Sequence, residues 1–129
     1  MEMFIVVLSL VGATACSDIS ENVKPIDLAD AGTTAVIIAQ GGVEMNPVIG
    51  VAGNAASPLV AIAVKSGLRY TMRGVLPEGV ADHSVDLGGY VGTCNNLAVL
   101  AGVATFPTSL IYGAACGLGY HIWWKADAE

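Results

Sequence analysis

The chain has 129 residues, a length typical of one domain, and 54% of them are hydrophobic while only 12% are charged. Soluble domains usually carry about 25% charged residues, so this composition indicates a membrane protein, with a soluble domain around an Ala/Val-rich core as the alternative. The net charge of −6, with five basic residues in all, excludes the basic footprint of a nucleic-acid-binding protein.

The N-terminal segment is a short hydrophobic run that ends in a cysteine. Residues 4–16 read FIVVLSLVGATAC, and as a helix they would rise only about 20 Å, short of the ~30 Å hydrocarbon core of a bilayer. This length suits a signal peptide, and the small residues before Cys16 resemble a bacterial lipobox, so Cys16 is a candidate for lipidation. Because Glu2 stands where signal peptides carry positive charge, an uncleaved hydrophobic anchor and an ordinary core helix remain open.

Four further segments follow the N-terminal run, residues 1–16, and a polar tether, residues 17–25. The pattern predicts a helix over residues 26–40, ended by the Gly41-Gly42 pair. A second helix is expected from residue 47 to about residue 72, with a kink at Pro58. Residues 74–90 read as a polar loop, and the apolar block 91–124 reads as a long C-terminal helix. Residues 26–129 would then form one membrane helical domain.

Asp30 lies within the first expected helix, where a carboxylate at mid-bilayer costs about 2.5–3.5 kcal/mol. Thr33 and Thr34 lie on the same helical face and can donate hydrogen bonds. A hairpin would bring the start of this helix close to the end of the next one, which carries Lys65 and Arg69. We therefore predict an intramembrane polar cluster in which Asp30, or Asp27 one turn earlier, pairs with one of these cations.

The cluster admits two interpretations. Intramembrane ionisable residues often mark a proton or ion path. The alternative is a structural clamp that locks two helices together. The clamp is favoured, because transporters usually have more spans and an internal repeat.

A second polar group falls in the predicted hairpin turn. Gly41 and Gly42 end the first helix, and Glu44 and the Asn46-Pro47 pair follow within six residues. Asparagine caps helices and proline favours their first position, so these residues are expected to start the second helix. An acid catalyst at Glu44 is the less favoured alternative.

The remaining reactive residues show no catalytic or metal-binding pattern. His83 is expected in a solvated loop and His121 at a membrane–water interface beside Trp123 and other aromatic residues. Cys94 and Cys116 lie in apolar surroundings, where free cysteines behave as small hydrophobic residues, and the odd cysteine count argues against a fully paired set. No spacing fits zinc, and no cofactor is expected.

One string supports a resemblance. D-x-x-T-T, six residues, G-G-x-E-x-N-P and a lysine about 18 residues later resembles a group of small membrane proteins of unknown function from bacteria and their phages. The matching positions are Asp30, Thr33, Thr34, Gly41, Gly42, Glu44, Asn46, Pro47 and Lys65. The likeness covers about a third of the chain. It implies a membrane-embedded helical hairpin and no known activity.

Together these observations predict an all-α fold, a small polytopic membrane bundle consisting of a helical hairpin and a long C-terminal helix. The expected role is non-enzymatic, structural or accessory, in a bacterial cell membrane. The expected partners are the lipid bilayer and a second copy or another membrane protein, without nucleic acid. A phage holin-like lysis protein and a small transporter or channel subunit using Asp30 are the alternatives.

Overall fold

The computed structural model describes residues 21–45 and 49–128, and within them it consists of helices and turns without a strand. Four α-helices follow in order: α2 (Pro25–Ala39), α3 (Ser57–Arg73), α4 (Glu78–Leu100) and α5 (Leu110–Asp127). Two short 3₁₀ helices, η1 (Gly50–Ala52) and η2 (Asn54–Ala56), precede α3. The prediction of an all-α fold is confirmed.

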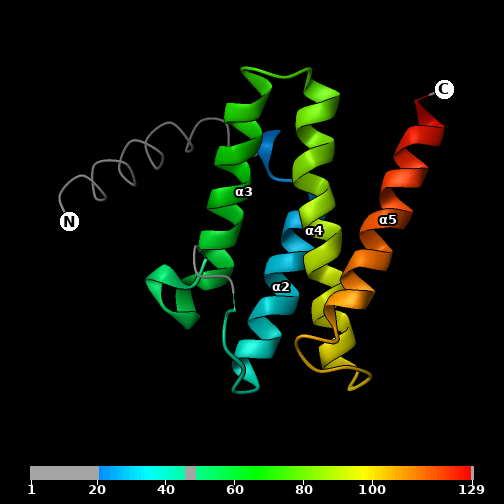
Figure 1. Cartoon of the computed structure of the whole chain (residues 1–129). Helices are drawn as coiled ribbons and strands as arrows, with labels where there is room; N and C mark the ends of the chain where they lie inside the picture. Colours follow the sequence, from blue (N-terminus) through cyan, green and yellow to red (C-terminus); the bar gives the residue numbers. More distant parts are fainter. Residues whose placement is uncertain (1–20, 46–48, 129) are drawn as a thin grey trace.

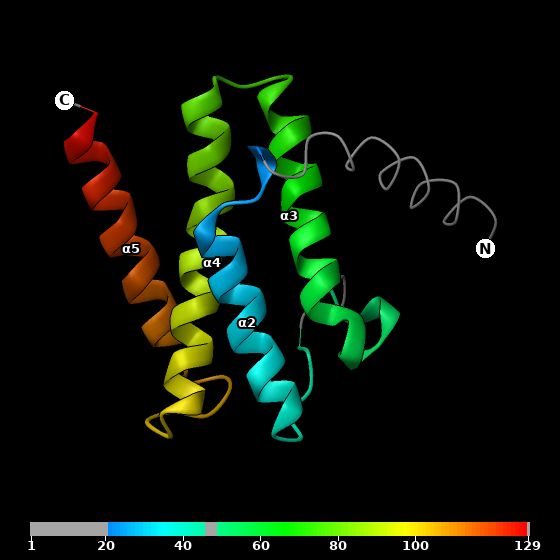
Figure 2. The same ribbon diagram turned by 180° about the vertical axis from the view of Figure 1, so that it is seen from behind.

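The helices form a bundle of three with a fourth at one side (Figures 1 and 2). Helices α2, α3 and α4 all contact one another, whereas α5 packs against α4 alone among the described elements. Helix α4 starts at the upper end of the bundle in Figure 1, and α3 and α5 finish there, while α2 starts about halfway down and runs in the same direction as α4. The turn after α2 and the loop between α4 and α5 lie at the opposite end.

Helix α2 agrees with its prediction to within one residue at each end. Pro25 occupies the first turn, where its missing N–H leaves no helical hydrogen bond unmade. The Asp27 carboxylate accepts a hydrogen bond from the backbone N–H of Lys24 at 2.9 Å and so caps the start of the helix. After the helix, Gly41 adopts a φ of +88°, a conformation that glycine reaches without strain.

The second helix begins ten residues later than predicted, at Ser57 instead of residue 47. Between η1 and η2 Gly53 has a φ of +90°, which interrupts any continuous helix there. Pro58 consequently falls in the first turn of α3, where proline is tolerated, and the predicted kink is wrong.

The prediction of a polar loop followed by one long helix is also wrong. Residues 78–90 are helical and belong to α4, and the apolar block is divided into α4 and α5. Glu78, Asp82 and Asp86 are spaced by four, so they share one side of α4, and a helix can bury that side when cations meet it. The division follows from Gly102, with a φ of +69°, and Pro107 in the connecting loop.

Helices α4 and α5 approach closely because two glycines lie at their contact. A Cβ at Gly113 would lie 2.6 Å from the carbonyl oxygen of Val91, and one at Gly117 would lie 2.6 Å from the Val91 side chain. A disulfide between Cys94 and Cys116 joins the same two helices. The expectation that these two cysteines are free is therefore wrong, and the third cysteine, Cys16, lies outside the described residues.

The bundle buries a set of ion pairs and exposes many large apolar side chains. Its largest fully buried side chains are Arg69, Asp27, Ser57 and Ser109. Large apolar side chains are exposed on every helix, among them Leu28, Leu59, Leu97, Ile111 and Leu118. Among the described residues no helix has both the length and the hydropathy to cross a bilayer, so the expected membrane-crossing helices have no support in this part of the chain.

Candidate functional site

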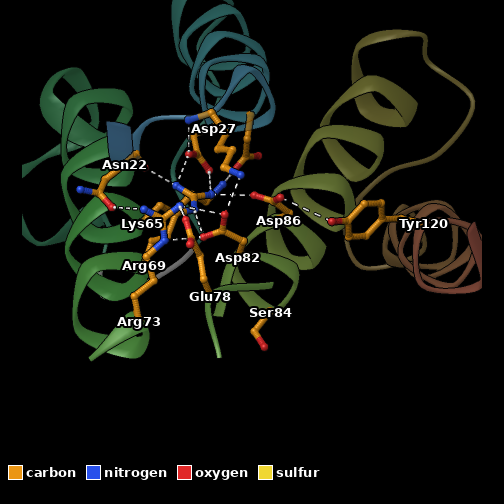
Figure 3. Close-up of polar contacts among 12 residues, drawn as sticks. Asn22, Asp27, Lys65, Arg69, Arg73, Glu78, Asp82, Ser84, Asp86 and Tyr120 are labelled. Carbon is orange, nitrogen blue, oxygen red and sulfur yellow. Dashed lines mark hydrogen bonds and ion pairs between the residues drawn. The ribbon is translucent and has the colours of Figure 1, made fainter. Parts of the chain in front are cut away.

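The centre of the polar interior is Arg69, which α3 directs towards α2 and α4 (Figure 3). Its side chain is 0% exposed. Nη1 lies 2.7 Å from Oδ2 of Asp27 and also donates to the backbone carbonyl of Asn22, while Nη2 lies 2.7 Å from Oδ1 of Asp86. Nε faces Asp82 at 3.6 Å. One guanidinium therefore joins three helices, since its fork of donors reaches carboxylates on two neighbours at once.

A second layer lies closer to the upper end of the bundle. Arg73 donates from Nε and Nη2 to the two carboxylate oxygens of Asp82, both at 2.8 Å, and the Lys24 Nζ lies 2.7 Å from Asp82 Oδ2. The hydrogen bonds with Asp82 raise the pKa of Arg73. Glu78 lies 3.5 Å from Arg73 but is mostly in solvent. Asp82 thus accepts hydrogen bonds from two cations in different segments of the chain, in addition to its contact with Arg69.

A third layer lies deeper in the bundle and contains Asp30. Lys65 Nζ contacts its carboxylate. The Asn96 amide of α4 donates to the hydroxyls of Thr33 and Thr34 at 3.1 and 2.9 Å and reaches Asp30 at 3.5 Å. The threonines were expected to donate to the carboxylate. Thr33 instead donates to backbone carbonyls of its own helix, at Ala29 and Asp30, which leaves its oxygen free to accept from Asn96.

These layers form one set that we call the buried charge network: Lys24, Asp27, Asp30, Lys65, Arg69, Arg73, Asp82 and Asp86. It contains four of the chain's five basic residues and an equal number of aspartates, so it is electrically neutral. The net charge of −6 therefore arises from residues outside it. Neutrality matters because a buried charge without a partner costs several kcal/mol.

Sequence reasoning located half of this network. The hairpin geometry predicts that Asp30 or Asp27 meets Lys65 or Arg69, and the structure places Lys65 against Asp30 and Arg69 against Asp27. Asp82 and Asp86 were missed because they fall in the segment predicted as a loop. The signal that points to them is a pair of regularly spaced series of charged residues, one basic and one acidic, which we call matching ladders. Basic residues at positions 65, 69 and 73 and acidic residues at positions 78, 82 and 86 have the same spacing of four, as two packed helices with facing charges require.

The predicted turn residues do not start α3. Glu44 donates its backbone N–H to the side-chain oxygen of Asn54 at 3.1 Å, which ties the turn after α2 to η2. Gly42 lies against Ile37 so closely that a Cβ would collide with it. Asn46 and Pro47 lie outside the described residues.

The histidines form a second cluster, between α4 and α5, and the expectation of a solvated His83 is wrong. His83 is buried, its Nε2 lies 3.0 Å from Nδ1 of His121, and its ring stacks on Trp124 with centroids 4.0 Å apart. Burial lowers the pKa of His83, and the neighbouring His121 lowers it further. The lowered pKa favours the neutral form of His83, whose ring nitrogens can then donate or accept in the contact with His121 according to the tautomer.

Tyr120 connects the two clusters. Its hydroxyl lies 3.4 Å from Asp86 Oδ2 (Figure 3). Its ring stacks on those of His83 and Tyr90. Burial raises its pKa to about 12, so the hydroxyl stays protonated and serves as the donor to the carboxylate. Among the described residues, no group of three or more histidine, cysteine and acidic side chains is placed to hold a metal ion.

The fold and the site define an all-α helical bundle organised around a buried, neutral charge network. No protein-family model, curated protein or solved structure matches the chain. The resemblance to small membrane proteins therefore stays a prediction, and the function is argued from the geometry.

Proposed function

We propose that the protein is a small membrane-embedded helical bundle with a non-enzymatic, structural or accessory role in the bacterial cell envelope. In this proposal the buried charge network is a clamp that holds α2, α3 and α4 together. The observation that carries the proposal is the placement of charge inside the bundle and large apolar side chains outside. In water the hydrophobic effect drives the opposite arrangement.

The exposed apolar residues support a lipid environment. Leu59 is 72% exposed and Ile111 is 71% exposed, and each of the other two helices also exposes large apolar residues, such as Leu28 and Leu97. Large exposed apolar residues are unfavourable in water, whereas lipid tails accept them without cost. Charged groups inside a membrane protein face the bundle interior and pair with one another, which describes the positions of Asp27 and Arg69.

The pairing within the network supports a clamp over an ion path. Each of its aspartates lies within 4 Å of at least one cation, and Arg69 contacts three of them. A carboxylate that carries a proton or an ion must lose and regain its partner during each cycle. Here such a loss would leave a buried cation uncompensated at a cost of about 3–5 kcal/mol.

Reconstitution into phosphatidylcholine liposomes tests both parts of the proposal. The wild type should stay with the liposomes after washing with alkaline carbonate, and it should conduct no protons across them under an imposed pH gradient. Asp27→Asn should lower the midpoint of thermal unfolding, because it removes one of the carboxylates that compensate Arg69. Glu21→Gln, outside the network, is the matched control and should unfold like the wild type.

Two results would contradict the proposal. Release of the wild type by carbonate would remove the membrane assignment. Proton flux in the wild type that disappears in Asp30→Asn, with unchanged thermal stability, would establish an ion path in place of the clamp.

A further inference from the structure

The charged residues of all four helices are confined to one part of each helix. In α2 they lie in the first six residues and in α4 in the first nine; in α3 they lie in the last nine residues and in α5 in the last three. The remaining stretches, residues 31–39, 57–64, 87–100 and 110–124, contain no charged side chain. This pattern holds in helices of opposite direction, so helix polarity does not explain it.

The tertiary arrangement brings all four charged parts to the same end of the bundle. Helix α4 starts where α3 and α5 finish, at the upper end in Figure 1, and α2 starts lower on the bundle but runs in the same direction as α4, so its charged first part also lies on the side of that end. We call this the charged end. The opposite, uncharged end consists of residues 40–45, η1, η2 and the loop 101–109. Of its described residues only Glu44 is ionisable.

The exposed side chains of the two ends also differ in polarity. Val51, Val103 and Phe106 at the uncharged end are 63%, 60% and 47% exposed. At the charged end Trp123 and Trp124 are followed by Lys125, a combination that favours the headgroup region of a bilayer. The two ends therefore suit two different depths in a membrane.

The length of the uncharged part limits how deep it can reach into a bilayer. Its helical stretches have 8 to 15 residues, which rise about 12–22 Å at 1.5 Å per residue. The hydrocarbon core is ~30 Å thick. The uncharged part therefore reaches well into a bilayer from one side and is too short to cross it.

We propose that the bundle inserts into one face of the bilayer by its uncharged end, with its charged end at headgroup level. This inference rests on the proposed membrane function and adds the orientation and depth. The ligand of this surface is the acyl-chain region of a lipid bilayer. In this position the Lys65–Asp30 pair is the deepest ion pair of the buried charge network, and Asn96 supports it from α4.

Depth-dependent fluorescence quenching tests the inference. Trp123→Phe and Trp124→Phe give a tryptophan-free background, because these are the only two tryptophans. Phe106→Trp then reports on the uncharged end, and Val75→Trp, an 80% exposed apolar position in the loop of the charged end, is the matched control. Each variant is reconstituted in phosphatidylcholine vesicles with a spin label near the headgroup or near the end of the acyl chain, after its helicity has been checked by circular dichroism.

The inference predicts that Phe106→Trp is quenched more by the deep label and Val75→Trp more by the shallow label. Equal depths for the two tryptophans would overturn the orientation and leave the membrane assignment standing. Quenching of neither tryptophan by either label would overturn the membrane assignment itself. A blue-shifted Phe106→Trp emission without quenching would show that protein covers this end, and would also overturn the inference.

Discussion

Asp30 lies at a point where α2, α3 and α4 meet, and its surroundings leave little room. Lys65 contacts the carboxylate from α3, and Asn96 reaches it from α4. Gly92, one turn before Asn96, presents only its backbone to the same carboxylate. The missing side chain at Gly92 is therefore what lets α2 approach α4 at this level.

Gly92→Ala should destabilise the bundle, because the new Cβ would overlap the Asp30 carboxylate. We expect the free energy of unfolding to fall by about 1–3 kcal/mol, the usual cost of overpacking a close contact. Gly88→Ala is the matched control, since it lies in the same helix with open space around it. That control should be neutral or stabilise by about 0.5–1 kcal/mol through helix propensity. Chemical unfolding in detergent micelles measures the free energy of unfolding of both variants. An equal change in the two would show that the close contact with Asp30 does not contribute to stability.

At the scale of elements, α5 depends on α4 for its position. The Cys94–Cys116 disulfide joins the two helices, and Ser109 donates to the Asn95 side-chain oxygen at 2.7 Å near the start of α5. The histidine pair and Tyr120 hold the other part of the helix. Because α5 has no second described helix against it, these contacts decide whether it stays on the bundle.

Removal of the disulfide should therefore affect α5 first. Its two cysteines are 22 residues apart, and closure of a loop of this size restricts the unfolded chain by about 3 kcal/mol. We expect Cys94→Ala with Cys116→Ala to lower the unfolding midpoint and to shift the Trp124 emission to the red, as that ring leaves His83. A dithiol reductant should reproduce both effects in the wild type and change nothing in the double variant. An unchanged midpoint after complete reduction would show that the remaining contacts hold α5 by themselves.

At the scale of the whole molecule, the separation of charge along the bundle axis determines how the protein meets a membrane. A lysine introduced at the uncharged end should oppose insertion, because a charge deep in hydrocarbon costs about 2.5–3.5 kcal/mol. Val103→Lys should therefore lower the partition into liposomes by up to about three hundredfold. Val75→Lys, at the charged end, should partition like the wild type to within about twofold. Co-sedimentation with liposomes gives both values, and an equal loss for the two lysines would contradict one-sided insertion.

Parts of this structure follow from local signals in the sequence. Pro25 and the Gly41-Gly42 pair are a helix start and a helix stop, and they bound α2 almost as predicted. The positions of Asp30 and Lys65 followed from a hairpin, because antiparallel neighbours bring the start of one helix to the end of the next. The predicted loop at residues 74–90 and the absence of Asp82 and Asp86 from the predicted cluster have one cause. Charged residues at 78, 82 and 86 favour a solvent-facing segment, whereas the structure places Asp82 and Asp86 against cations on a helix.

The sequence by itself determined the helical class, the low charge and the matching ladders of acids and bases, since these depend on residue type and spacing alone. Only the tertiary structure decided that Arg69, Asp82 and Asp86 of these ladders face inward, that Cys94 meets Cys116 and that His83 meets His121. It also decided that the charged parts of four helices gather at one end (Figure 1). The physical reason is that the free energy of a charge depends on its partners and solvent, and a helix period alone does not state which neighbour will supply them.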